Sequence, residues 1–164
     1  MSERELVTML EFADATVQQI FKLTKRIFPM WHMVTATGET KLMPSPSEDK
    51  DIAARRVRAL FEELDVVRYV FVSEAWTVDI KPEDYPKIVG WLNREGSLEN
   101  YPGRSECLKM QGEDSESSAQ LSWSRAIIRP KIGSARLGDL EKNASWKSDG
   151  RMVGLLPKRK ATHH

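Results

Sequence analysis

Cysteine and histidine are scarce in this chain of 164 residues, which contains one cysteine and three histidines. A lone thiol, Cys107, cannot close a disulfide within the chain, and this favours a reducing compartment. Outside the last two residues the only histidine is His32. The common zinc sites combine three or four Cys, His or carboxylate ligands. We therefore expect neither a metal site nor another cofactor.

Glycine motifs for phosphate and long apolar segments are also missing. Neither GxGxxG nor the GxxxxGK motif of phosphate-binding loops occurs, so nothing supports nucleotide-dependent catalysis. The apolar runs are a few residues long, whereas a membrane-spanning helix needs about 20. Residues 1–5 are partly acidic and lack the apolar segment of a signal peptide. We expect a soluble, cytoplasmic protein that does not contact a membrane.

The charged residues are present in nearly equal numbers, with a formal net charge of +1, but they are unevenly distributed. Residues 125–164 contain ten Lys or Arg against three Asp or Glu. Composition therefore predicts one α+β domain over residues 1–130 and a basic, partly irregular extension over residues 131–164. A basic segment can attract nucleic acid, or it can be a solvated tail.

The most informative segment is residues 66–76, which reads Val-Val-Arg-Tyr-Val-Phe-Val-Ser-Glu-Ala-Trp. Apolar residues occupy both alternating sets of positions, which is typical of a central strand covered on both faces. Glu74 shares its set with Val72 and Trp76. An ionised carboxylate is costly there unless it is paired or hydrogen-bonded. Glu74 is therefore predicted to be a structural anchor or a working acid.

The remaining segments predict an α+β fold. In order along the chain, we expect a helix over about residues 3–27, a hairpin over 31–43, a helix from Ser47 to Asp65, the central strand, a short helix from Pro86 to Gly96 and a hairpin over 106–129. The order helix, hairpin, helix, strand, hairpin favours a mostly antiparallel sheet of about five strands packed against two main helices.

Two carboxylates are the candidates for catalysis. Glu74 lies near the end of the central strand, and Glu106 lies at the start of another strand, so the two could face each other across the sheet. Paired carboxylates shift each other's pKa and can share acid and base roles or bind a divalent cation. The alternative is that Glu74 accepts a salt bridge from an arginine or hydrogen bonds from a loop.

Aromatic and basic residues are the candidates for binding. Trp76 and Trp123 lie on expected strands, Arg125 follows Trp123 closely, and Arg104 lies in the segment before the second hairpin. Core packing explains tryptophans on strands, whereas exposed ones would form a partner surface or a platform for stacking bases. No recognised nucleic-acid-binding motif accompanies these residues, so nucleic acid stays an alternative partner.

The long first helix offers another interface. Its apolar stripe covers about seven turns, more than a small sheet needs. Part of the stripe could therefore pair with a second copy of the chain, or the whole of it could pack on its own sheet.

A few sequence strings are shared with other proteins. Residues 70–76 (Val-Phe-Val-Ser-Glu-Ala-Trp), residues 102–106 (Pro-Gly-Arg-Ser-Glu) and residues 112–114 (Gly-Glu-Asp) resemble small uncharacterised bacterial and phage proteins, roughly over residues 30–130. The resemblance implies no activity and no site.

These observations favour a binding or regulatory domain, acting through a protein partner or through self-association. A carboxylate- or metal-dependent enzyme centred on Glu74 and Glu106 is the first alternative. The second is a nucleic-acid-binding accessory protein that uses its basic C-terminal part.

Overall fold

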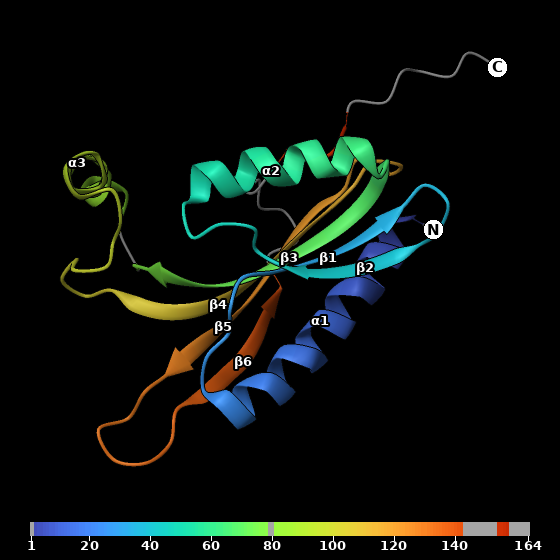
Figure 1. Cartoon of the computed structure of the whole chain (residues 1–164). Helices are drawn as coiled ribbons and strands as arrows, with labels where there is room; N and C mark the ends of the chain where they lie inside the picture. The colour runs from blue at the N-terminus through green and yellow to red at the C-terminus, as the bar shows by residue number, and fades with distance from the viewer. Residues whose placement is uncertain (1, 79–80, 143–153, 158–164) are drawn as a thin grey trace.

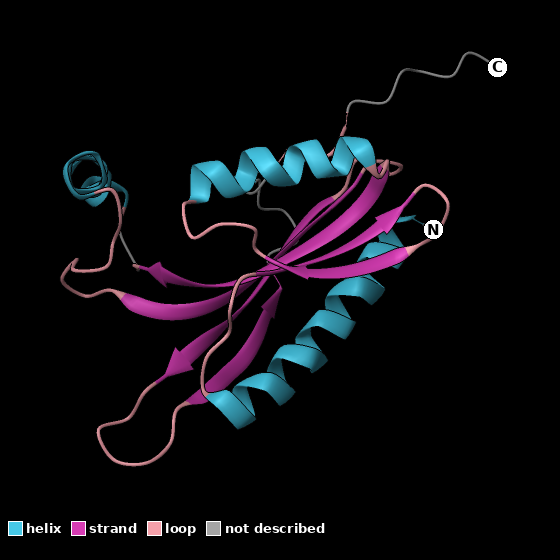
Figure 2. Cartoon of the chain, viewed as in Figure 1, coloured by secondary structure: helices cyan, strands magenta, loops and turns pink. Residues whose placement is uncertain are grey.

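The computed structural model describes residues 2–78, 81–142 and 154–157 of the chain. Its elements are, in order, α1 (Ser2–Thr24), β1 (Met30–Thr35), β2 (Thr40–Pro44), α2 (Lys50–Glu63), β3 (Val66–Thr77), the 3-10 turn η1 (Pro82–Asp84), α3 (Tyr85–Glu95), β4 (Ser105–Asp114), β5 (Gln120–Ile128) and β6 (Arg136–Lys142). The expected α+β class is confirmed, with α1 and α2 as the two main helices (Figures 1 and 2).

The strands form one sheet in the order β2-β1-β3-β4-β5-β6, and every neighbouring pair is antiparallel. As expected, β3 lies in the interior of the sheet, between β1 and β4. The sheet has six strands where the sequence predicted about five. The additional strand is β6, which pairs with β5 and carries the sheet into the segment beyond residue 130 that we expected to be irregular.

The two main helices lie on opposite faces of the sheet, as Figure 2 shows. On the first face, α1 packs over β3, β4 and β6. Its stripe of Leu6, Leu10, Val17 and Phe21 is buried against apolar side chains of these strands. This helix ends at Thr24, earlier than expected, and Lys25 follows with a positive φ of 60°.

On the second face, α2 covers a cluster of aromatic side chains. Trp31 stacks at 4.2 Å between ring centroids on Phe71 and meets Phe61 of α2 edge-on at 5.8 Å. Tyr69 and Leu155 are fully buried in the same cluster. Leu155 and Leu156 therefore contribute to the core on this face.

The helix α2 starts at Lys50, with Asp49 rather than the expected Ser47 as its N-cap. The Asp49 carboxylate accepts hydrogen bonds from the backbone N–H groups of Asp51 and Ile52 at 2.9 and 3.1 Å. The Ser47 hydroxyl instead accepts from the backbone N–H of Asp49. Ser47 thus orders the approach to the helix, and the carboxylate makes the stronger cap because it is charged.

A mostly buried ion pair joins α1 to strand β5. The guanidinium of Arg125 on β5 binds the carboxylate of Asp14 on α1 in a bidentate manner, at 2.7 and 2.9 Å. It also donates to the carbonyl of Gly138 on β6 at 2.8 Å. Both side chains are mostly buried, with 11 % of Asp14 and 15 % of Arg125 exposed. One cation therefore ties three elements together.

The short helix α3 stands apart from this body. Figure 1 shows it beyond the ends of β3 and β4, away from α1 and α2. The loop that follows it supplies its packing partner, because Trp91 meets Tyr101 edge-on at 5.2 Å and donates its indole N–H to the carbonyl of Ser97. Its C-cap is Gly96, as expected, in the left-handed conformation at φ 76°.

None of the helices in the described ranges combines the length and the apolar character that a membrane crossing requires.

Candidate functional site

The two candidate carboxylates lie on the same face of neighbouring strands, as the sequence suggested. Glu74 on β3 pairs with Leu108, and Glu106 on β4 pairs with Trp76, so the two acids are diagonal neighbours. Each is engaged in a structural contact. Glu74 accepts a hydrogen bond from the backbone N–H of Ile27 at 2.7 Å. Glu106 forms an ion pair with Arg129 at 2.6 Å.

The contact of Glu74 follows from the burial of its strand. Residues 66–72 of β3 are buried on both faces, whereas residues 73–76 are half-buried, because the strand runs out beyond the helices there. Glu74 is thus less enclosed than its position between Val72 and Trp76 suggested. Its carboxylate holds the segment that connects α1 to β1, which matches the expected hydrogen bond from a loop.

The four candidate binding residues do not form one exposed surface. Trp76 is half-buried, and the guanidinium of Arg104 lies over its ring at 4.9 Å from the centroid. Trp123 belongs to the core on the α1 face and is 3 % exposed. Arg125 is held by Asp14. Trp123 and Arg125 are therefore structural residues, and the described part of the basic segment offers no stacking platform built on them.

Potential metal ligands are scattered over the described residues. No group of three or more His, Cys, Asp or Glu side chains in these ranges is arranged to hold a metal ion. Cys107 is buried, and burial raises the pKa of its thiol, which lowers its reactivity at neutral pH.

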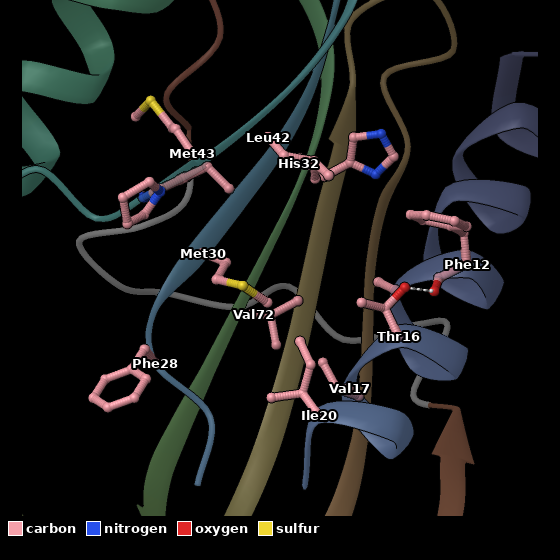
Figure 3. A pocket seen from close by; sticks show the side chains of 13 residues that line it. Phe12, Thr16, Val17, Ile20, Phe28, Met30, His32, Leu42, Met43 and Val72 are labelled. Carbon is pink, nitrogen blue, oxygen red and sulfur yellow. Dashed lines mark hydrogen bonds between the residues drawn. The ribbon is translucent and has the colours of Figure 1, made fainter. Parts of the chain in front are cut away.

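A groove of about 410 Å³ lies between α1 and the β1–β2 hairpin. The groove exists because α1 packs over β3, β4 and β6 and does not cover the β1–β2 hairpin, which lies beside the helix on the same face of the sheet. The α1 wall is formed by Phe12, Thr16 and Ile20, which follow one another at intervals of four residues. Figure 3 shows this row opposite Met30 and His32 of β1.

Apolar side chains dominate the groove. Its floor and second wall come from Phe28, Met30, Leu42, Pro44 and Val72, which lie on the linker, β1, β2 and β3. Three side chains on its rim are exposed to an unusual degree for their size, with 54 % of Phe12, 66 % of Phe28 and 66 % of Leu42 accessible. Clustered exposed apolar side chains of this size mark interaction surfaces.

Polar groups are few in the groove, and charged ones are missing. Among the described residues that line it, none is Asp, Glu, Lys or Arg. The hydroxyl of Thr16 donates to the carbonyl of Phe12 at 2.9 Å, within α1 (Figure 3). Such a surface offers nothing to a phosphate or a carboxylate, because these anions require cationic or N–H donors.

His32 is the one titratable side chain of the groove. Its ring lies 5.6 Å from the ring of Phe12, and burial lowers the pKa of its imidazole, so the neutral form prevails at neutral pH. Its Nδ1 atom is buried and has no hydrogen-bond partner within the described residues. An unpaired buried polar atom is costly.

Sequence reasoning missed the groove as a site. The long apolar stripe of the first helix was recognised, but Phe12 and Leu42 of the groove rim were not singled out. The signal that existed was the excess length of the stripe over the sheet. Which members of the stripe stay uncovered depends on where the helix crosses the sheet, and a single sequence does not contain that information.

Comparison of the chain with protein-family models, with curated proteins and with solved structures gives no match.

Proposed function

We propose that this chain is a protein-binding module and that the groove between α1 and the β1–β2 hairpin accepts an amphipathic helix. The observation that carries the proposal is the open apolar groove of about 410 Å³, rimmed by exposed Phe12, Phe28 and Leu42. Amphipathic helices bind such grooves through apolar anchors at spacings of three and four residues.

The width of the sheet supports a helical occupant. Six strands at about 4.8 Å spacing span roughly 24 Å, whereas one helix with its side chains covers about 10 Å. A single helix therefore leaves part of the first face uncovered. Packed helices lie about 8–10 Å apart, so a second helix beside α1 would rest on β1 and β2.

The dimensions of the groove agree with this geometry. Phe12 and Ile20 are eight residues apart on α1, which corresponds to about 12 Å, or slightly more than two helical turns. An incoming helix of that length presents three apolar side chains at positions i, i+4 and i+7. The uncharged lining favours apolar anchors over a charged peptide.

The test uses the methionine methyl groups as reporters. Met30 lines the groove, whereas Met33 and Met110 are buried elsewhere in the core and serve as internal references. The probe is a synthetic 14-residue amphipathic helix with Leu at its apolar positions and Lys at the others. The expected result is a saturable shift of the Met30 methyl resonance, with the reference resonances unchanged.

A matched pair of variants locates the binding. Leu42→Glu places a charge on the groove rim and should abolish the shifts, and Ile132→Glu changes a side chain that is 92 % exposed and distant from the groove lining, so it should leave them intact. Shifts that are absent, or that persist in Leu42→Glu, would refute the proposal. The groove volume also lies in the range of about 300–1,000 Å³ that suits small ligands. If native mass spectra show a bound molecule of a few hundred daltons that Leu42→Glu loses, the helix proposal is refuted in favour of a small apolar ligand.

A further inference from the structure

The helix α3 carries an apolar stripe that its own chain leaves largely uncovered. Tyr85, Val89 and Leu92 lie at positions i, i+4 and i+7 and are 54, 54 and 39 % exposed. On the adjacent side of the helix, Ile88 is buried and Trp91 meets the ring of Tyr101 edge-on. The apolar surface of α3 is thus wider than the contact that its own loop provides.

A helix of this size needs more packing than it has. An isolated helix shorter than about 12–15 residues is marginal in water, and α3 has 11 residues. Most of the stability of such a helix comes from burying its apolar face, and Figure 1 shows neither α1 nor α2 beside it. The stripe of Tyr85, Val89 and Leu92 therefore lacks a partner within the described part of the chain.

We propose that α3 of one copy of this chain lies in the groove of a second copy. This inference rests on the proposed function, because it names the amphipathic helix that the groove accepts. Within the described residues, the chain has an apolar groove between α1 and the β1–β2 hairpin that holds no helix, and a helix, α3, whose apolar stripe is exposed.

The two surfaces match in length and in chemistry. The 11 residues of α3 extend over about 16 Å, which exceeds the roughly 12 Å of the α1 wall. The stripe is uncharged, as is the described lining of the groove, and the cations Lys87 and Arg94 lie on the opposite side of α3, where they would stay in water.

Reciprocal exchange would close the assembly. If each copy inserts its α3 into the groove of the other, both surfaces are used and the assembly ends at two chains related by a two-fold axis. We therefore expect a homodimer.

The first experiment measures mass against concentration by sedimentation equilibrium. The wild-type chain should dimerise, and both Val89→Glu on α3 and Leu42→Glu in the groove should raise the dimer dissociation constant at least about 30-fold, the effect of losing one central contact. Ile132→Glu changes an exposed apolar residue outside both surfaces and should leave the constant unchanged. A wild-type chain that is monomeric at millimolar concentration, or a dimer indifferent to Val89→Glu, would overturn the inference.

The second experiment identifies which surfaces meet. Val89→Cys protein is mixed with Leu42→Cys protein and treated with a short bismaleimide. A covalent heterodimer should form in the mixture, in clear excess over the homodimers of either variant alone. Cys107 gives little background because it is buried, and the wild-type chain measures that background. Preferential Leu42→Cys homodimers would show a groove-to-groove contact and overturn the inference, as would cross-linking equal to that of an Ile132→Cys partner.

The two proposals can fail separately. If the synthetic helix binds the groove but Val89→Cys does not cross-link to Leu42→Cys, the groove accepts a helix that is not α3. If the synthetic helix does not bind and the chain stays monomeric, both proposals fail.

Discussion

Replacing Asp14 with alanine should destabilise the fold strongly, because it leaves the guanidinium of Arg125 without its carboxylate. The two hydrogen bonds at 2.7 and 2.9 Å would be lost, and only the bond from Arg125 to the carbonyl of Gly138 would remain. A guanidinium does not lose its proton in proteins, so Arg125 would remain charged, mostly buried and without its carboxylate partner.

The expected magnitude follows from the burial of the pair. Breaking a fully buried ion pair costs about 3–5 kcal/mol. Since Asp14 is 11 % and Arg125 15 % exposed, we place the loss for Asp14→Ala at the lower end, about 3 kcal/mol. For a chain of this length, that corresponds to a fall in Tm of about 6–12 °C.

The assay is urea unfolding, monitored by tryptophan fluorescence and circular dichroism. It is repeated on a double variant in which both members of the ion pair are replaced. Replacing the pair by apolar residues, Asp14→Leu with Arg125→Met, should recover most of the loss, because no unpaired charge remains. Asp139→Ala removes an exposed carboxylate that also acts on Arg125 and should leave the midpoint almost unchanged.

A loss of less than about 1 kcal/mol for Asp14→Ala would refute this reasoning, since that is the level of a surface pair. So would a double variant that loses as much stability as the two single variants added together, because the free energies of two coupled partners should not be additive.

Three further predictions concern single side chains. Glu74→Ala leaves the backbone N–H of Ile27 without its carboxylate acceptor and should cost about 1–3 kcal/mol in urea unfolding, whereas Glu74→Gln keeps an acceptor oxygen and should cost less than half as much. Gly112→Ala would place a Cβ atom 2.7 Å from Leu6 Cδ1 and should cost about 1–3 kcal/mol; an unchanged midpoint would contradict the tight packing of α1 on β4. Because burial lowers the pKa of His32 in the folded chain, the unfolded chain binds that proton more tightly, so stability should be complete above pH about 6.5 and fall as the pH drops below it. His32→Leu should remove this part of the pH dependence between about pH 7.5 and 5, and an unaltered slope would exclude His32 as its source.

Most of the fold could be predicted from the periodicity of the chain. In residues 66–72 both alternating sets of positions are mainly apolar, which indicates burial on both faces. The structure confirms that this strand lies in the interior of the sheet. The strand β6 was not predicted because only Leu137 and Leu140 face the core, and charged residues surround them in the sequence. The N-cap of α2 was misplaced because Ser47 and Asp49 are both good caps two residues apart, and only the backbone conformation decides between them.

The candidate site was less accessible to sequence reasoning. Glu74 and Glu106 were correctly placed near each other, but the partners that occupy them, Ile27 and Arg129, lie on loops whose paths no periodicity encodes. Trp123 and Arg125 could not be told apart from surface residues until α1 was placed over them. The groove depends on how α1 is placed on the sheet relative to the β1–β2 hairpin, which is a tertiary contact. That the long first helix leaves apolar surface for a second copy stays a prediction.

The outermost strands of the sheet also bear on how the chain resists aggregation. Strand β6 carries Arg136, Asp139, Glu141 and Lys142 within seven residues, and β2 is only five residues long and ends at Pro44, which has no N–H to donate. Charge, shortness and proline are the usual means by which natural sheets avoid edge-to-edge growth into fibrils. Molecules of this protein should therefore meet through side chains rather than through backbone pairing. Loss of the β6 charges should therefore favour amyloid-like assembly through this edge.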